Sequence, residues 1–332
     1  VLKKEGKSKI LILFIVILLI LLIIVGIGIF FVWSKWSKVD FKELDNSDLS
    51  VTTDIYDQGS DKVTEEEFNE IITIAFFGTD SRDTSNMNSG RSDTIMLASI
   101  NPNLKSIKLI SIPRDTYVEV PGYGKTKINH AYAYGKEQLS IKTINSNFGL
   151  NITEYATIDF SGLVNIINDV GGIELTITES EKNYINTYVK ESYELTGNPV
   201  KKIENAGKVI LTGEQALTHS RNRTVGNDFS RASRQRDVVE ALMNKISTMD
   251  LNTIISLLDS FLPEVRTNIN PTKYIGLLTS ILSNRGEYLN NIISVQVPST
   301  EYASGKMIDG IYYFVSDMDT AKNDIYKYIY EQ

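Results

Sequence analysis

The chain has 332 residues, 42% of them hydrophobic, with 34 basic residues against 41 acidic ones and no cysteine. This length is enough for a large core, and the lack of cysteine excludes disulfides, thiolate metal sites and a cysteine nucleophile. The two histidines are too few for a His-rich metal site, and the net charge of -7 argues against nucleic-acid binding.

A long apolar stretch lies near the N-terminus. No charged residue occurs from 10 to 33. At roughly 1.5 Å per residue this stretch forms about 36 Å of helix, enough to cross a hydrocarbon core of ~30 Å. The alternative, a cleaved secretory signal, would have a shorter apolar stretch and a small-residue cleavage site. The lysines of 1–9 favour a cytoplasmic tail there, so 10–33 is predicted to be a single-pass anchor in the cell membrane with an extracytoplasmic remainder.

Residues 34–69 are rich in acidic and hydroxyl side chains without sustained periodicity, which predicts an extracytoplasmic spacer. A capping-box pattern at Thr64 and Glu67 favours a short helix within it. Residues 70–332 show no shift in composition and are predicted to form one domain.

Short apolar runs stopped by turn residues predict strands at 71–77, 93–100 and 106–112, with a turn at 101–103. Further strands are predicted at 172–177, 291–297 and just after 312. Helical patterns fall at about 137–147, 160–168, 213–220 and 229–247, and at the C-terminus up to 330. This alternation predicts an α/β domain, a central mixed sheet flanked by helices.

Arginine is the minority among the basic residues, and most arginines fall in three short stretches. These are Arg82 with Arg91, then Arg114, then Arg221, Arg223, Arg231, Arg234 and Arg236. A guanidinium is a planar fork that binds phosphate or carboxylate with two hydrogen bonds and stays charged when dehydrated. The clustering therefore indicates an anion site.

One face of the predicted helix 229–247 supports this interpretation. Arg231 and Gln235 continue the stripe formed by Val238, Leu242 and Ile246, so both are expected to face the protein. A buried guanidinium needs an anion, and a helix N-terminus favours a phosphate. Asp228 is a plausible N-cap for this helix. An internal ion pair with Asp228 or another acid is the alternative.

The hairpin around Asn103 brings a second group together. If pairing centres there, Asp93 lies opposite Pro113 and next to Arg114. Asp80 follows the first strand, at the sheet end where ligands usually bind. Two carboxylates beside arginines suggest ligands for Mg²⁺ and clamps for phosphate oxygens, the alternative being a surface charge network. The full group is Asp80, Arg82, Arg91, Asp93 and Arg114.

Several segments resemble the LytR-CpsA-Psr family of Gram-positive cell-envelope proteins. They are 77–82, 91–97, 111–118, 127–135, 170–174, 211–217, the pair Arg221 and Arg223, and 228–235, in the family's order and behind a single anchor.

The resemblance implies a phosphotransferase that moves a glycopolymer from a polyprenyl-pyrophosphate lipid to peptidoglycan, typically to the C6 hydroxyl of N-acetylmuramic acid. It implies an α-β-α fold in which Asp80 and Asp93 ligate Mg²⁺. The pyrophosphate would be surrounded by Arg82, Arg91, Arg114, Arg221, Arg223 and Arg231, with Gln235 close by. Asp228 would act as a general base or hold Arg231, and these alternatives stay open.

Two positions depart from the family's pattern. His219 stands where the family often has Tyr, and Lys136 where a second Gly commonly follows Tyr-Gly. Three other functions remain open: a hydrolase or pyrophosphatase of the same lipid, a non-catalytic lipid- or glycan-binding protein, and a transcriptional attenuator. The acidic outer part and the lack of a DNA-binding motif disfavour the last of these, and no nucleic-acid partner is expected.

Overall fold

The computed structural model describes residues 38–51, 69–79, 90–197, 199–222 and 228–331. The predicted anchor at 10–33 and the predicted helix at Thr64 lie outside these ranges. Within them, no helix is long and apolar enough to span a membrane. The chain divides into two compact units, each built from several segments that alternate along the sequence. Among the described residues, we call them the sheet unit, 41–157, Thr267–Ile269 and 292–331, and the helical unit, 38–40, Ile158–Arg266 and Asn270–Asn291.

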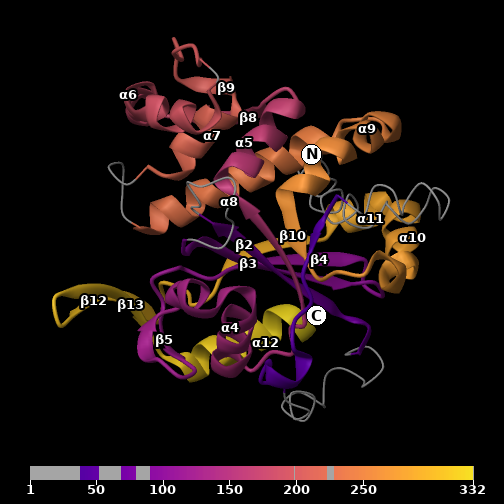
Figure 1. Cartoon of the computed structure of the whole chain (residues 1–332), viewed down its shortest axis with the longest axis vertical. Helices are drawn as coiled ribbons and strands as arrows, with labels where there is room; N and C mark the ends of the chain where they lie inside the picture. Colours follow the sequence, from indigo (N-terminus) through magenta and orange to yellow (C-terminus); the bar gives the residue numbers. More distant parts are fainter. Residues whose placement is uncertain (1–37, 52–68, 80–89, 198, 223–227, 332) are drawn as a thin grey trace, which may run out of the picture. The chain divides into compact units, whose positions relative to one another are not determined.

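The main sheet has seven strands in the order β1-β10-β7-β2-β3-β4-β11. Their bounds are Asp40–Phe41 (β1), Ile72–Thr79 (β2), Ser92–Asn101 (β3), Ser106–Ser111 (β4), Glu154–Asp159 (β7), Val265–Thr267 (β10) and Ile292–Gln296 (β11). Strands β2, β3 and β4 pair antiparallel, whereas β11 joins β4 in parallel. The predicted central mixed sheet is therefore confirmed (Figure 1).

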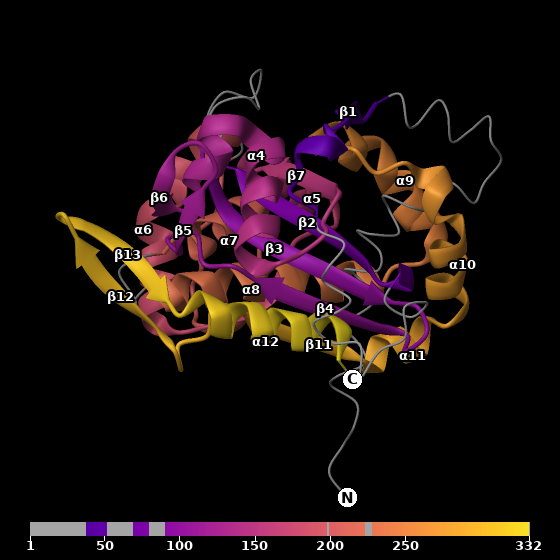
Figure 2. The same ribbon diagram turned by 90° about the horizontal axis from the view of Figure 1, so that it is seen from below.

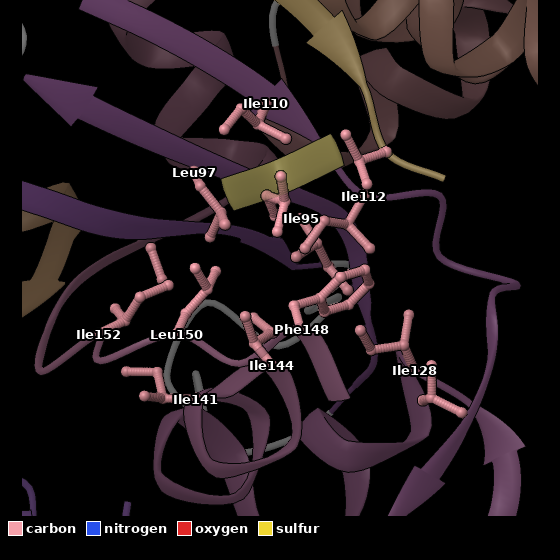
Figure 3. Packing of buried hydrophobic residues seen from close by; sticks show 14 of the residues in the cluster. Ile95, Leu97, Ile110, Ile112, Ile128, Ile141, Ile144, Phe148, Leu150 and Ile152 are labelled. Atoms are coloured by element: carbon pink, nitrogen blue, oxygen red, sulfur yellow. The ribbon is translucent and has the colours of Figure 1, made fainter. Parts of the chain in front are cut away.

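The core of the sheet unit lies between this sheet and two helices, α4 (His130–Phe148) and α12 (Met318–Tyr330), which run along it in Figure 2. Figure 3 shows Ile95 and Leu97 of β3 facing Ile144 and Phe148 of α4. All six residues of β4 are buried, because both faces of this strand are covered. Three of these buried residues are polar, Ser106, Lys108 and Ser111. Lys108 Nζ donates to the carbonyl oxygen of Glu331 over 2.9 Å.

The sheet unit also holds two small antiparallel ribbons, β5 with β6 and β12 with β13. Their bounds are Tyr117–Val120 (β5), Gly124–Lys127 (β6), Ala303–Ile308 (β12) and Ile311–Ser316 (β13). Helix α4 begins earlier than the predicted 137–147, at His130, and is interrupted at Gly135 and Lys136. The prediction therefore matches the part of α4 that follows the break.

The helical unit contains the ribbon β8–β9 and most of the helices. Their bounds are Phe160–Asp169 (α5), Ile173–Ile177 (β8), Glu179–Thr196 (α6), Gly207–Leu211 (β9), Gly213–Ser220 (α7), Asp228–Ser247 (α8), Leu251–Phe261 (α9), Ile275–Ser283 (α10) and Arg285–Asn290 (α11). The predicted helices at 160–168, 213–220 and 229–247 are confirmed as α5, α7 and α8. Helix α6 and helices α9 to α11 were not predicted.

Helices α5 and α7 approach closely at a glycine. A Cβ atom on Gly213 would lie 2.3 Å from the carbonyl oxygen of Val164, so no other residue fits there without moving backbone. Helix α7 starts with a capping box in which Thr212 and Gln215 cap each other. Together these features fix the start of α7, and Arg221 is the C-cap residue at its other end.

Candidate functional site

In the sheet unit, Asp93 and Arg114 form an ion pair at the end of the β3–β4 hairpin. Arg114 Nη1 donates to Asp93 Oδ1 over 2.5 Å, with both side chains largely buried. The observed register places Met96 opposite Ser111, which shifts the expected pairing by one residue. The prediction that Asp93 faces Pro113 is therefore wrong by one position, and Arg114 is the residue that Asp93 meets.

A β-bulge accounts for the direction of Asp93. Gly78 pairs with Thr94 and Thr79 pairs with Ser92, so Asp93 is an extra residue in β3. A bulge bends its strand and re-aims the side chain of the extra residue. A Cβ atom on Gly78 would lie 3.0 Å from Thr94 Cβ, so glycine leaves room for this close strand pairing.

Four further residues extend this ion pair into what we call the sheet-end cluster: Arg91, Asp93, Arg114, Asp115, Lys127 and His130. Lys127 Nζ lies 2.6 Å from Asp115 Oδ1, and Arg114 Nε lies 3.4 Å from Asp115 Oδ2. Arg91 is exposed and has no ion-pair partner among the described residues. With three cations against two carboxylates, the cluster keeps a positive charge that suits an anion.

Within this cluster, His130 is a neutral base. Burial lowers its pKa, the charges of Arg91 and Lys127 lower it further, and Asp115 opposes them. The imidazole Nδ1 lies 2.8 Å from Thr126 Oγ1, which fixes the ring. His130 is therefore a hydrogen-bonded histidine at the edge of the charged group.

In the helical unit, a second set surrounds the Arg221 segment, and we call it the α7–α8 cluster: Glu181, His219, Arg221, Asn222 and Arg234. The Arg221 guanidinium lies 5.5 Å from the ring centre of Phe160, a cation–π contact. Arg234 Nη2 donates to the carbonyl oxygen of Asn222 over 3.0 Å, which ties α8 to the residue that follows Arg221.

Arg234 belongs to one of the arginine-rich stretches, but the sequence did not assign it to the pyrophosphate site, and it is only 5% exposed. Its Nη1 lies 3.7 Å from Glu181 Oε1 on α6. The spacing of Arg234, Val238 and Ala241, by four and then three residues, marks this core-facing side, and all three are buried. This spacing was a signal in the sequence that Arg234 is buried. Its ion-pair partner, Glu181, lies on α6, a helix that the hydrophobic periodicity did not reveal.

His219 is buried in the same cluster, and its Nδ1 atom has no hydrogen-bond partner in the described part of the chain. Burial lowers its pKa to about 4, Glu181 opposes this shift and Arg234 adds to it. His219 is therefore neutral at physiological pH.

The other predicted site residues are placed only in part. Gln235 is half-buried on α8, and Val238, Leu242 and Ile246 are buried as the stripe predicts. Asp228 and Arg231 lie in the first turn of α8, but their side chains fall outside what the structure describes, as do residues Asp80, Arg82 and Arg223 altogether.

The magnesium prediction depends on Asp93, because Asp80 is outside the described residues. In the described ranges no group of three or more His, Asp or Glu side chains is arranged to hold a metal ion. Mg²⁺ is usually held by one or two carboxylates together with substrate phosphates. Asp93, a largely buried carboxylate within the positively charged sheet-end cluster, fits that pattern.

A family model matches most of the chain. The model of the LytR_cpsA_psr family covers residues 41–328, which includes both clusters and most of both compact units. This chain belongs to the LytR-CpsA-Psr family.

Similar members of the LytR-CpsA-Psr family are named polyisoprenyl-teichoic acid–peptidoglycan teichoic acid transferase TagU. The Bacillus mycoides protein is 33% identical over 77% of each chain, and a Bacillus cereus protein is 30% identical over 89% of each. The Enterococcus faecalis protein is 37% identical over 188 residues, which span 56% of each chain.

Solved structures of the family share the fold. The protein gbs0355 of Streptococcus agalactiae has a TM-score of 0.62 at 25% identity, covering 81% of this chain and 91% of that one. TagT bound to LI-WTA has a TM-score of 0.60 at 24% identity, covering 81% and 94%. TagT with octaprenyl pyrophosphate lipid has a TM-score of 0.56 at 23% identity, covering 78% and 90%.

Proposed function

We propose that this protein is a membrane-anchored, extracytoplasmic phosphotransferase that attaches a polyprenyl-pyrophosphate-linked glycopolymer to peptidoglycan. The transferred polymer would be wall teichoic acid, a capsular polysaccharide or a related glycan. The observation that carries the proposal is the family match over 41–328, whose similar members are named teichoic acid transferases. The positively charged sheet-end cluster supports it, because the donor is a pyrophosphate.

The reaction would be an in-line displacement at phosphorus. The C6 hydroxyl of N-acetylmuramic acid attacks the sugar-linked phosphorus, a new P–O bond forms, and the bond to the bridging oxygen breaks. Polyprenyl phosphate leaves with that oxygen, and the hydroxyl proton passes to a base. Positioning and charge neutralisation would provide most of the acceleration.

In this reaction the arginines bind the diphosphate and stabilise charge on its oxygens. We assign that role to Arg82, Arg91, Arg114, Arg221, Arg223 and Arg231, with Gln235 as a neutral hydrogen-bond donor. Asp228 takes the proton or holds Arg231. Asp80 and Asp93 would hold Mg²⁺, which when bound neutralises phosphate charge.

A transfer assay with the full-length chain in detergent tests the proposal. The donor is a short synthetic polyprenyl-pyrophosphate oligosaccharide, the acceptor is uncrosslinked peptidoglycan, and mass spectrometry follows the products with Mg²⁺ and with EDTA. Glycan on peptidoglycan that forms only with Mg²⁺ is expected. Free glycan alone would contradict the transferase in favour of the hydrolase, and donor binding without product would favour a lipid-binding role.

The Arg114→Ala variant tests the sheet-end cluster. Loss of one charge-stabilising donor typically costs about 10²–10³ in turnover, so kcat/KM should fall by that factor. Arg114→Lys keeps the charge and should recover part of the activity. Lys306 is exposed on β12, so Lys306→Ala should leave the rate unchanged. If Arg114→Ala lowers the melting temperature and turnover only in proportion to folded protein, Arg114 has a structural role instead.

The absence of native cysteine allows a clean test of topology. Ser304 is exposed on β12, so Ser304→Cys introduces a single accessible thiol. A membrane-impermeant maleimide should label it in intact cells, and deleting 10–33 should release the protein from the membrane fraction. Labelling that requires cell lysis would contradict the extracytoplasmic assignment.

A further inference from the structure

Three aromatic rings stack on the surface of the sheet unit, and neither proposed cluster uses the outer two. The rings of Tyr123 and Tyr134 are nearly parallel, with centres 4.4 Å apart and planes at 19°. The His130 ring is 5.8 Å from Tyr134 on a tilted plane. Tyr123 is 57% exposed and Tyr134 is 46% exposed, which is unusual for large rings. We call this group the ring stack.

The local backbone holds the ring stack in place. Tyr123 closes a turn in which its N–H donates to Val120 O over 2.9 Å. Pro121 and Gly122, the latter with φ of 83°, occupy the two middle positions that favour a type II turn. Tyr134 projects from the first part of α4, before the break at Gly135. Rings held this way lose little conformational entropy when they bind a ligand.

The ring stack is continuous with the sheet-end cluster through the backbone. The N–H of Asn129, the residue before α4, donates to Arg114 O over 3.2 Å, and β5 and β6 lie beside α4 (Figure 2). Strand β5 begins three residues after Arg114, and the turn that ends in Tyr123 follows it. At ~3.3 Å per residue, the four residues of β5 place Tyr123 about 13 Å along the ribbon from the start of the strand. A single sugar on the pyrophosphate does not cover that distance, whereas a polysaccharide strand does.

The chemistry of the ring stack fits a neutral sugar. Apart from Tyr134, the Tyr123 ring contacts no other aromatic ring among the described residues, and more than half of the Tyr123 surface is exposed. An aromatic face carries negative charge density, which attracts the C–H groups on the apolar face of a pyranose. The side chains of the stack are two phenols and an imidazole, which offer ring faces and hydroxyl groups to a sugar. The cations Arg91 and Lys127 act on His130, the ring that the stack shares with the sheet-end cluster.

We infer that the ring stack is a binding subsite for an N-acetylhexosamine ring of the acceptor glycan strand, with the sugar stacked on Tyr123. This inference rests on the proposed function for the identity of the acceptor. It adds a place on the surface where the strand is held while one of its sugars reaches the diphosphate.

Binding measured without the donor tests the subsite separately from transfer. The probes are an N-acetylglucosamine oligomer and solubilised uncrosslinked peptidoglycan strands, titrated by calorimetry into the full-length chain in detergent. Tyr123→Ala should weaken both affinities about fivefold to tenfold, as expected for one stacked ring. Tyr123→Phe keeps the ring and should bind like the wild type. Tyr188 is similarly exposed, on α6, so Tyr188→Ala is the matched control.

The same variants in the transfer assay separate the two ideas. The acceptor KM should rise in Tyr123→Ala, while donor KM and kcat stay unchanged. Unchanged oligomer affinity in Tyr123→Ala would overturn the subsite even if the wild type transfers normally. A rise confined to the donor KM would also overturn it, because the stack would then hold the donor polymer. Oligomer binding lost with Tyr123, in a protein without turnover, would support the subsite while the transferase fails.

Discussion

The ion pair between Arg234 and Glu181 should matter more to stability than a shorter pair on the surface. Arg234 is buried, lies 3.7 Å from Glu181 and also donates to Asn222 O over 3.0 Å. Lys208 and Glu174 on the β8–β9 ribbon are 2.8 Å apart, but their side chains are 70% and 56% exposed. Both pairs belong to the helical unit, which makes Lys208 a matched control.

Removing Arg234 leaves the Glu181 carboxylate largely buried without this cation and removes the bond to Asn222. Breaking a buried pair costs about 3–5 kcal/mol, and the partial exposure of Glu181, at 13%, favours the lower end. Arg234→Met should therefore lower the free energy of unfolding by about 3 kcal/mol. Lys208→Met should cost about 0.5 kcal/mol or less, because water screens the exposed pair.

Urea unfolding, together with hydrogen exchange of peptides from α6, α7 and α8, measures both variants. Exchange in those helices should accelerate in Arg234→Met and stay near the wild-type rate in Lys208→Met, since local opening reports local stability. Equal losses in the two variants would refute the reasoning, because burial would then not determine the energy of the pair. An Arg234→Met loss below about 1 kcal/mol would also refute it.

Three other predictions concern single residues. Burial lowers the pKa of His219 to about 4 in the folded protein. As pH falls, His219 is therefore protonated in the unfolded chain before it is protonated in the folded one. The free energy of unfolding should drop by up to about 3 kcal/mol between pH 6.5 and 4. His219→Gln should lose that slope in urea titrations, and a slope like the wild type's would contradict the assignment. Gly213→Ala should cost about 3 kcal/mol or more in urea unfolding, because its Cβ meets the Val164 carbonyl, whereas Gly276→Ala, in an open helix position, should stabilise by roughly 0.5–1 kcal/mol. Lys136 adopts φ of 54° and ψ of -146°, a region that only glycine occupies readily. Lys136→Gly should therefore raise the melting temperature by relieving about 1 kcal/mol of backbone strain. An unchanged or lower melting temperature would show that contacts of the lysine side chain offset this strain.

The sequence by itself determined the main strands, the α7 and α8 helices and the charged composition of the site. Strands β2, β3 and β4 were predictable because their apolar runs end at turn residues, and α8 because Val238, Leu242 and Ile246 recur at helical spacing. The arginines stood out because lysine is the usual basic residue in the rest of this chain. These signals depend only on residues that are close together in the sequence, so they can be recognised without knowledge of the fold.

Tertiary structure decided which side chains meet. The one-residue shift in register and the bulge at Asp93 arise from pairing between strands, and a strand's own sequence does not encode them. The burial of Arg234 depends on Glu181, more than fifty residues away on a helix whose polar composition concealed it. The ring stack likewise needs a turn and a helix to bring Tyr123 and Tyr134 together. Such contacts depend on chain segments that are distant in sequence, and only the folded molecule sets their separation.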